Sequence, residues 1–525
     1  MPGDDMDRGS RGTLIEAFIT GAKHHPDARL VVASETRPAE ARLAEIVAQG
    51  RHIGEELRCL GIEPGDVVAA QLPAWQEWLL VAVAAAQAGA VLLPIISIYG
   101  PKELRFVLTK SRAKVLITPD RWRRADYAEI VDRCGDLPDL AHHVVIGEAW
   151  SGALPWSQLL TARPAGPPVP RAADDRAMLI YTSGTTAEPK GVQHSNRTLL
   201  AELAAMAEAR RALAGREVAL SPWPPGHVAG VIQLMRFLVD GVPLVAMDQW
   251  DPATAAALVA RHRVTSTSGT PFHLGGMLDA AERDGRDLSS LSHYAVGAAP
   301  VPSTLIARCS ALGLATFRSY GSTEHPTVTT GDPGDRLEKR LTTEGRPMRG
   351  VEIRVVDEDG SDMGSGLDGE IATRGPDLFL GYSDPALNDA TFLPGGWYRT
   401  GDIGRLDEDG FLLITDRKKD IIIRGGENIA SREVEDLLHG HPAVAEVAVV
   451  AAPDERMGEI VRAYVALRPG ASLALKDVSA YFAAAGVARQ KTPEQLVLVE
   501  MLPRNATGKV LKHELRERAR SQARR

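Results

Sequence analysis

The sequence predicts an α/β fold: a large N-terminal domain with mixed and parallel sheets flanked by helices, a β-rich subdomain, and a small α+β C-terminal domain. In the first part of the chain, strand-length apolar runs alternate with longer runs of helical period, which indicates βαβ units. From about Gly345 the runs become short, alternating and broken by Gly and Asp, as in antiparallel hairpins. The chain has 525 residues, more than one hydrophobic core usually organises, so we expect several domains.

The elements of the first part follow from periodicity and from helix-ending glycines such as Gly61. Helices are predicted over 42–61, 78–88, 100–112, 196–215 and 251–263, and strands over 65–73, 90–95, 113–119, 241–248 and 291–297. The apolar stretch 78–96 is long enough to suggest a membrane span. It contains Gln87, Gly89 and Pro94, so we interpret it as a buried helix followed by a short strand.

The second part divides into hairpins and a compact tail. Strands are predicted over 350–360, 369–375 and 410–417, then a helix, two strands, a helix, a strand and a helix over 431–440, 444–453, 460–470, 475–486, 494–503 and 509–520. The tail has a normal domain size. A charged, non-periodic run from Asp416 to Asp420 is typical of an exposed linker, so we expect domains over residues 1–416 and 417–525.

Composition excludes several functional classes. The formal net charge is −8 and the sequence pI is about 6.0, which argues against a nucleic-acid binder. Three widely spaced cysteines (Cys59, Cys134 and Cys309) show no disulfide or metal-binding spacing. The N-terminus is polar and lacks the apolar core of a secretory signal. We therefore expect a cytoplasmic protein without a membrane span.

The first motif is YTSGTTAEPKG, Tyr181 to Gly191. It follows the buried strand pattern of 177–182 and precedes a helical pattern with Ser195 or Asn196 as N-cap, so the loop is expected to join a strand to a helix. Its glycine, hydroxyl and lysine groups suit a phosphate, although a flexible Ser/Thr-rich loop fits equally well. Lys190 stands between Pro189 and Gly191, so the loop does not match the Walker A pattern.

Three further motifs carry polar groups in glycine-containing turns. In RSYGSTEHP, Tyr320 is an aromatic plate and Glu324 is a hard oxygen ligand suited to Mg²⁺. In YRTGD and the strand that follows, Asp402 can accept hydrogen bonds from a ribose diol, with Arg417 near the same sugar. In PRNATGK, Lys509 precedes a helix, where a cation opposes the helix dipole and so suggests a partner elsewhere. Each motif alone also fits an ordinary turn or helix start.

Taken together, these motifs resemble the adenylate-forming superfamily, which includes acyl-CoA synthetases, adenylation domains of peptide synthetases and beetle luciferases. YTSGTTAEPKG, PWPPGHVAG, VGAAPVP, YGSTE, YRTGD, DRKKD with GGENI, and PRNATGK occur in the family's order over nearly the whole chain. The resemblance implies a large N-terminal domain, a small mobile C-terminal domain, and an active site between them.

The resemblance also implies roles for individual residues. Lys509 would bridge the substrate carboxylate and the α-phosphate, His227 would lie near the acyl pocket, Glu324 with Thr185 would hold Mg²⁺, and Lys419 would be the hinge. The remaining nucleotide and cofactor contacts would come from Thr182, Ser183, Gly184, Thr185, Thr186 and Lys190 for the triphosphate; Gly297, Ala298, Ala299, Pro300, Tyr320, Gly321, Ser322 and Thr323 for adenine and phosphate; Asp402 and Arg417 for ribose; and Gly425 and Gly426 for a pantetheine tunnel. The chain departs from the family pattern at Ala187, where glycine is usual, and at Ser431, where proline is common.

The implied function is an ATP-dependent acyl-CoA synthetase. It would activate a medium-chain fatty, alicyclic or aryl acid to acyl-AMP, release pyrophosphate, and transfer the acyl group to coenzyme A, as a monomer or homodimer. An adenylating enzyme that loads a separate carrier protein is the first alternative. A catalytically silent nucleotide-binding protein is the second, and the presence of Lys509, Glu324 and Asp402 argues against it.

Overall fold

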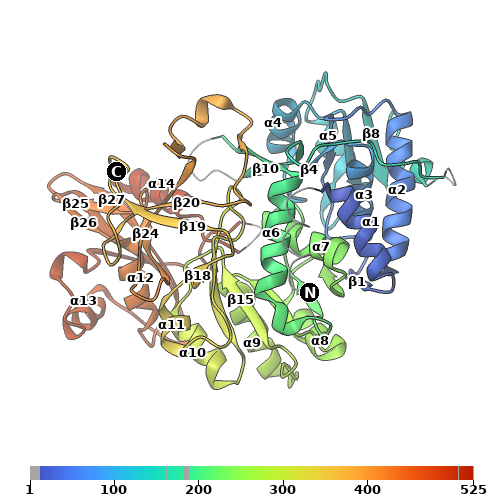
Figure 1. Ribbon diagram of the computed structural model, residues 1–525. Helices are drawn as coiled ribbons and strands as arrows, with labels where there is room; N and C mark the ends of the chain where they lie inside the picture. The colour runs from blue at the N-terminus through green and yellow to red at the C-terminus, as the bar shows by residue number, and fades with distance from the viewer. Residues whose placement is uncertain (1–11, 161–163, 183–187, 506–507, 524–525) are drawn as a thin grey trace.

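Two large sheets, a β-rich unit and a C-terminal α+β unit make up the computed structural model of the protein (Figure 1). The structure describes residues 12–160, 164–182, 188–505 and 508–523. In Figure 1 the blue helices of the N-terminal region lie at one side, and the orange and red C-terminal strands lie at the other. The α/β fold class predicted from the sequence is confirmed.

The first large sheet has eight strands in the order β21-β11-β10-β4-β3-β5-β8-β9. Its central strands are parallel, and β11 pairs antiparallel with β10 and β21. The strands are β3 (Val67–Ala70), β4 (Val91–Pro94), β5 (Val115–Pro119), β8 (His142–Ile146), β9 (Leu154–Pro155), β10 (Arg176–Thr182), β11 (Lys190–Ser195) and β21 (Gly381–Tyr382).

The second large sheet has nine strands in the order β18-β17-β16-β15-β14-β12-β13-β1-β2. The run from β16 to β1 is parallel, and the edge strands are antiparallel. Its strands are β1 (Arg29–Ala33), β2 (Ala39–Arg42), β12 (Ala219–Ser221), β13 (Leu244–Met247), β14 (Ser266–Gly269), β15 (His293–Gly297), β16 (Thr316–Tyr320), β17 (Thr329–Thr330) and β18 (Arg346–Pro347).

Helices join the parallel strands and form the cores with them. They are α1 (Leu14–His24), α2 (Leu43–Cys59), α3 (Gln76–Gln87), α4 (Pro101–Ser111), α5 (Tyr127–Asp132), α6 (Asn196–Ala209), α7 (Val228–Asp240), α8 (Pro252–His262), α9 (Pro271–Asp284), α10 (Ser303–Ala311) and α11 (Leu337–Thr342). The largest core cluster combines residues of α1, α2, α3 and α7 with strands from both sheets, so one apolar layer holds the two sheets together. Burial of this layer is the main stabilising contribution.

The helix predicted from Trp78 is a buried core helix, as expected. It is α3, and β4 follows it after Gly89, which has a positive φ of 69°. Of the helices in the described part of the chain, none has the length and apolar content needed to cross a membrane.

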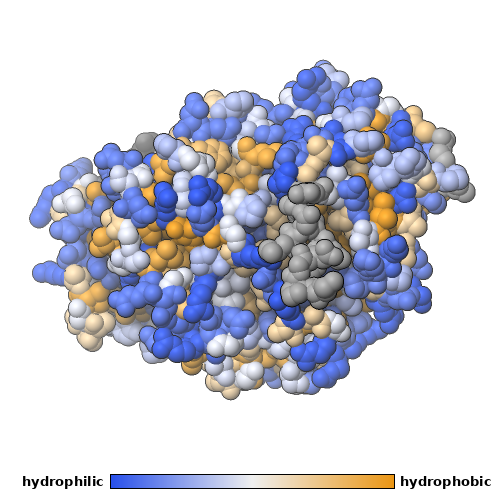
Figure 2. Space-filling view, in the orientation of Figure 1, coloured by the Kyte–Doolittle hydropathy of each residue, from blue (hydrophilic) through white to orange (hydrophobic). Residues whose placement is uncertain are grey.

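The β-rich unit contains β19 (Glu352–Val356), β20 (Gly369–Arg374), β22 (Phe392–Leu393), β23 (Trp397–Leu406) and β24 (Leu412–Arg417). All its pairings are antiparallel, as the short alternating runs predicted. In Figure 2 hydrophobic side chains gather on the surface near β20 and β24, while most of this face is hydrophilic.

The C-terminal unit has the predicted order of elements. Strands β25 (Ile422–Arg424), β26 (Glu427–Ile429), β27 (Val444–Asp454), β28 (Gly458–Leu467) and β29 (Gln495–Leu498) form one sheet with helices α12 (Ser431–His439), α13 (Leu475–Ala484) and α14 (Lys512–Ala523). The expected exposed linker is exposed only at Lys418 and Lys419. Asp416 is buried, because its carboxylate accepts hydrogen bonds from the backbone N–H and the hydroxyl of Ser431.

Candidate active site

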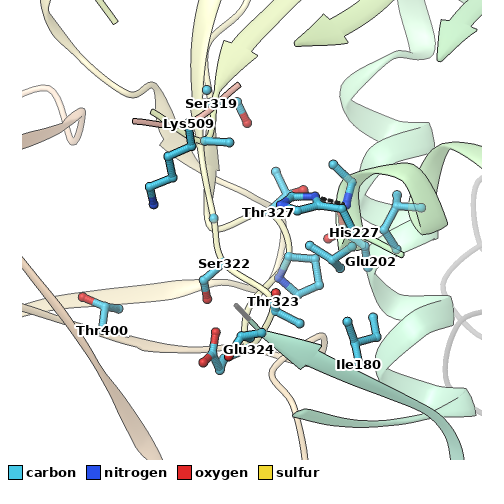
Figure 3. A pocket seen from close by; sticks show the side chains of 18 of the residues that line it. Ile180, Glu202, His227, Ser319, Ser322, Thr323, Glu324, Thr327, Thr400 and Lys509 are labelled. Carbon is cyan, nitrogen blue, oxygen red and sulfur yellow. Dashed lines mark hydrogen bonds between the residues drawn. The ribbon is translucent and has the colours of Figure 1, made fainter. Parts of the chain in front are cut away.

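A single cavity of about 1100 Å³ lies where the carboxyl ends of the two large sheets meet the C-terminal unit. Loops at the carboxyl ends of parallel strands are the usual ligand sites of α/β folds. Figure 3 shows Lys509, Ser322, Glu324 and Thr400 around one space, with Glu202 and His227 farther along the cavity. Sequence motifs that are far apart along the chain therefore meet in one place.

The first motif begins and ends at the cavity wall. Thr182, at the end of β10, and Lys190, at the start of β11, are opposite each other in an antiparallel pair, and both line the cavity. The prediction that this loop joins a strand to a helix is wrong, because residues 190–195 pair with both β10 and β21 and form β11 before α6 begins. Ser183, Gly184, Thr185, Thr186 and Ala187 lie outside the described residues.

The helix after this hairpin begins as predicted. The hydroxyl of Ser195 accepts a hydrogen bond from the backbone N–H of Thr198 at 3.2 Å, which caps α6. The ammonium of Lys190 lies 4.8 Å from the centroid of the Tyr382 ring, within cation–π range. This contact leaves the charge of Lys190 at the cavity wall.

Glu324 is held by a tyrosine that the sequence motifs did not indicate. Its carboxylate lines the cavity, and its Oε1 accepts a hydrogen bond of 2.7 Å from the hydroxyl of Tyr382. The preceding residue, Thr323, accepts a hydrogen bond of 2.8 Å at its carbonyl oxygen from Nε2 of His194. Burial lowers the pKa of His194 to about 4, so it is neutral at pH 7 and donates from one defined ring nitrogen.

Asp402 joins the second and third motifs. It is buried on β23, and its two carboxylate oxygens accept hydrogen bonds from the hydroxyl of Tyr320 (2.7 Å) and from Nε of Arg417 (2.6 Å). Asp402 and Arg417 are also opposite each other in the β23–β24 ladder. The negative charge of Asp402 raises the pKa of Arg417, which stays protonated.

Lys509 reaches the cavity from the C-terminal unit, as Figure 3 shows. Its backbone N–H donates to the side-chain oxygen of Asn505 at 3.0 Å. The charge of Arg417, then burial, lowers the pKa of Lys509 to about 7, and Lys419 contributes in the same direction. Because Arg417 and Lys419 add positive charge next to Lys509, this part of the cavity is suited to binding anions.

His227 lies at the start of α7, where its Nδ1 accepts a hydrogen bond from the backbone N–H of Ala229 at 3.2 Å. Its ring stacks on Trp223 with centroids 5.3 Å apart. Burial lowers the pKa of His227 to about 4, with the charge of Lys509 as a smaller cause. The imidazole is therefore neutral at pH 7.

The backbone approaches the cavity closely at two predicted glycines. A Cβ at Gly297 would collide with the carbonyl oxygen of Ser319, and one at Gly321 would collide with that of Pro326. Gly297, Ala298, Gly321 and Ser322 line the cavity. Only glycine fits at positions 297 and 321.

Some predicted site residues are not part of the cavity lining. The cavity is lined by 51 described residues, and these do not include Ala299, Pro300, Tyr320, Asp402, Gly425 and Gly426. Tyr320 and Asp402 are linked to the lining through Arg417, which does line it. Gly425 and Gly426 form the β25–β26 turn with positive φ angles of 58° and 89°. Their predicted contact with a cofactor stays a prediction.

Sequence motifs also missed residues that line the cavity. Tyr382 comes from a segment with no local chemical pattern. Glu202 lies on α6, which the sequence presents as an ordinary amphipathic helix, and Arg210 immediately follows this helix. Their separation of eight residues, about two helical turns, was the available signal.

A magnesium ion fits the chemistry of Glu324. Mg²⁺ in nucleotide sites takes one or two carboxylates and completes its shell with phosphates and water. The described residues contain no group of three or more His, Cys, Asp or Glu side chains that would bind a metal without a nucleotide. The carboxylate of Glu324, in a cavity that is also lined by Lys190, Arg417 and Lys509, therefore suits a metal that arrives with a polyphosphate.

Comparison with known proteins identifies the class. Residues 18–383 match the family model of AMP-binding enzymes, and residues 433–509 match the AMP-binding enzyme C-terminal domain. The chain belongs to the AMP-binding enzyme family, the adenylate-forming enzymes that its motifs resemble.

Individual relatives are similar over most of their length. The medium-chain fatty-acid–CoA ligase of Escherichia coli is 37% identical over 87% of this chain and 82% of its own. The 3-(7a-methyl-1,5-dioxo-octahydro-inden-4-yl)propanoyl:CoA ligase of Mycobacterium tuberculosis is 35% identical over 96% of this chain and 98% of its own. The crystal structure of ATP-bound MatB from Rhodopseudomonas palustris superposes with a TM-score of 0.86 at 27% identity, covering 96% of this chain and 98% of that one.

Proposed function

We propose that the protein is an ATP-dependent acyl-CoA synthetase that converts a carboxylic acid to its acyl-adenylate and then to its CoA thioester. One observation carries the proposal: Lys509 and Glu324, on different structural units, line the same cavity of about 1100 Å³, whose wall also includes the apolar side chains of residues 96, 223 and 232. That arrangement brings together a cation, a metal-binding carboxylate and space for an acyl chain. Relatives of this chain are named as CoA ligases of fatty and alicyclic acids.

The nucleotide binds along the cavity edge formed by the first three motifs. Thr182 and Lys190 contact the triphosphate together with Ser183, Gly184, Thr185 and Thr186. Adenine lies against Gly297, Ala298 and Gly321, which line the cavity beside one another. Asp402 and Arg417 bind the ribose, and Glu324 with Thr185 holds Mg²⁺, which neutralises phosphate charge when bound.

In the first step the substrate carboxylate attacks the α-phosphorus in line, and pyrophosphate leaves. Negative charge increases on the phosphoryl oxygens, so catalysis depends on positioning and electrostatic stabilisation. Lys509 donates hydrogen bonds to both the carboxylate and the α-phosphate and thereby brings two anions together. The polyanion also raises the pKa of Lys509 from its value near 7, which keeps the ammonium charged.

In the second step the thiol of CoA attacks the acyl carbon, and AMP leaves as the thioester forms. Lys509 is no longer needed, and the thiol needs a channel. We propose that residues 417–525 rotate as one domain about Lys419 against residues 1–416. The rotation exchanges the Lys509 turn for the Gly425–Gly426 turn, which then forms the wall of a pantetheine tunnel.

The substrate is a medium-chain, alicyclic or aryl acid rather than acetate; the cavity volume of about 1100 Å³ and the apolar side chains of residues 96, 223 and 232 in its wall support this assignment. The three cysteines are free, which suits a cytoplasmic enzyme. The residues proposed for both steps come from one chain, so a monomer or a homodimer is active.

The test measures AMP and pyrophosphate release with ATP, Mg²⁺ and a panel of carboxylic acids, with either CoA or a phosphopantetheinyl carrier protein as acceptor. Acid- and CoA-dependent AMP formation is the expected result. Turnover with the carrier protein alone would assign the enzyme to carrier loading, and the absence of pyrophosphate release with every acid would refute the adenylation proposal.

A further inference from the structure

The cavity continues from the end lined by Lys509 toward the amino ends of the parallel strands of the nine-stranded sheet. Strand β15 spans this distance: Gly297 lies at its carboxyl end beside the proposed adenine position, and His293 lies at its amino end, and both line the cavity. Four residues of strand correspond to about 13 Å. Arg210, which follows α6, lines the same distant end.

Arg210 is a buried cation with few partners. Its side chain is 9% exposed, and among the residues that the structure describes its hydrogen bonding is limited to one contact of 3.5 Å, from Nη1 to Oε1 of Glu217. A guanidinium has five N–H donors, and charged pairs normally close to 2.7–2.9 Å. Most of its donors are therefore available to a ligand in the cavity.

Glu217 does not serve as the main partner of Arg210, because other groups already hold it. Arg236 makes two hydrogen bonds to its carboxylate, at 3.1 and 2.7 Å, and the hydroxyl of Ser266 donates a third at 2.6 Å. The contact with Arg210 is the longest of the four. An arginine placed solely to stabilise the fold would be expected to pair more closely.

The charges of this cluster are balanced before any substrate binds. Arg210 and Arg236 carry positive charge, and Glu217 and Asp240 carry negative charge, with Asp240 3.9 Å from Nε of Arg236. Burial raises the pKa of Asp240 to about 6, so it remains mainly ionised at pH 7. The exposed carboxylate of Asp332 also lines this end. A second anion would therefore be repelled, whereas a neutral hydrogen-bond acceptor would be stabilised.

The properties of His293 also favour a neutral hydrogen-bond acceptor at this end of the cavity. It is 9% exposed, and its Nδ1 lies 3.1 Å from the hydroxyl of Ser292. Burial, and then the charge of Arg210, lower its pKa, so it contributes no positive charge at pH 7. The distant end of the cavity therefore offers one permanent cation and one neutral imidazole, next to the apolar ring of Phe317.

We propose that the preferred acid carries a ketone oxygen at the end of its acyl group farthest from the carboxylate, and that Arg210 donates a hydrogen bond to this oxygen. The inference rests on the proposed function and specifies its substrate class. An acid without this oxygen leaves the buried N–H donors of Arg210 without a hydrogen-bond partner, which makes its binding free energy less favourable. Arg210 therefore selects oxo acids over the corresponding unsubstituted acids.

The wild-type enzyme tests this selectivity directly. Acid-dependent AMP formation is measured for straight-chain and alicyclic acids with a ketone at successive distances from the carboxyl group, each beside its unsubstituted parent and a dicarboxylic acid of equal length. We expect kcat/KM for the best oxo acid to exceed that of its parent by about 10- to 100-fold, the value of one hydrogen bond to a charged group. The dicarboxylic acid should be the poorest of the three.

The Arg210→Met variant assigns the selectivity to this side chain, with Arg211→Met, at an exposed neighbour, as the matched control. In Arg210→Met the preference for the oxo acid should fall to about one, through a higher KM for that acid, while kcat/KM for the parent acid is unchanged or higher. Arg211→Met should keep the full preference. If Arg210 had only a structural role, the substitution would lower kcat/KM for both acids by the same factor.

Two results overturn the proposal while leaving the proposed function intact: activation of the parent acids with no oxo preference at any position, or a preference for the dicarboxylic acid. An equal loss for oxo and parent acids in Arg210→Met also overturns it. Failure to activate every acid would refute the proposed function as well, and the pyrophosphate assay separates that case from the others.

Discussion

The hydroxyl of Tyr382 donates a hydrogen bond of 2.7 Å to Oε1 of Glu324, although the two residues lie 58 positions apart. The bond fixes the direction of the carboxylate that we propose as the Mg²⁺ ligand. Burial and the charge of Glu324 raise the pKa of Tyr382, so the phenol keeps its proton and remains a donor. Tyr382 is therefore a positioning residue for the proposed metal ligand.

Tyr382→Phe tests this role. Removing the hydroxyl leaves Glu324 in place but free to rotate, so we expect kcat for adenylation to fall about tenfold and the Mg²⁺ concentration for half-maximal rate to rise. Pyrophosphate release against Mg²⁺ concentration gives both values. Tyr481→Phe, on the distant helix α13, is the control. An unchanged Mg²⁺ dependence would contradict the positioning role.

Lys509→Ala separates the two half-reactions. The first step should slow by about 10²–10³-fold, as for other preorganised electrostatic donors. Supplied acyl-AMP should still be converted to thioester at close to the wild-type rate, because the proposed rotation withdraws Lys509 in the second step. Lys476→Ala, at an exposed position of α13, is the control. Equal loss of both half-reactions would refute the proposed domain rotation.

The lowered pKa of Lys509 predicts a pH dependence. The ammonium is the active form, and in the free enzyme its pKa lies near 7, below the ordinary 10.5. We therefore expect kcat/KM for adenylation to fall about tenfold per pH unit above pH 7, since this parameter reports the free enzyme. The kcat profile should decline at higher pH, because bound ATP restores the ammonium. Lys509→Arg should lose the alkaline decline; if it kept that decline, another group would be responsible.

Glu344 connects the large domain to the C-terminal unit. It accepts hydrogen bonds from Arg318 at 3.4 Å and from Arg432 of α12 at 2.8 Å, and all three side chains are largely buried. Glu344→Gln removes the carboxylate that both arginines share and leaves Asp436 as a nearby negative charge, so the free energy of unfolding should fall by up to about 3–5 kcal/mol. We expect adenylation to slow relative to thioester formation, because the arrangement that brings Lys509 to the cavity is weakened. Glu338→Gln, at an exposed position, is the control, and an unchanged ratio of half-reactions would contradict the prediction.

Gly425 should matter only in the second step. Its φ of 58° strains any other residue, and a Cβ there would lie 2.5 Å from Cε of Met457. Since it does not line the cavity in this arrangement, Gly425→Ala should leave adenylation unchanged and slow thioester formation about tenfold. Gly410→Ala, which has a φ of 77° and no neighbour within 4 Å, controls for backbone strain alone. A loss confined to adenylation would contradict the tunnel proposal.

The sequence predicted the elements whose pattern is local. Strands β3, β4 and β5 and helices α2, α3 and α4 appear where periodicity placed them, and the C-terminal unit has the predicted order. The hairpin at Lys190 was missed, because residues 190–195 acquire strand structure only by pairing with β10 and β21. Likewise β1 inserts beside β13, more than two hundred residues away, which no local pattern reveals.

The same limit applies to the site. Motifs identified Glu324, Asp402, Arg417 and Lys509 because each has an unusual chemical context in a short stretch. Contacts that depend on the assembled fold were not predictable: the hydrogen bond from Tyr382 to Glu324 and the pairing of Glu344 with Arg432 join segments that are 58 and 88 positions apart. Their residue types are ordinary, and only the fold makes them neighbours.

The crowding of Arg417, Lys419 and Lys509 has a consequence for the direction of the reaction cycle. Asp402 and Asp420 offset part of this repulsion, and a bound polyphosphate would add further negative charge. In the proposed cycle, the departure of pyrophosphate removes that added charge, so the repulsion that lowers the pKa of Lys509 increases again. Product departure would then favour the movement of the Lys509 turn away from the cavity, which is the change that we propose for thiol transfer.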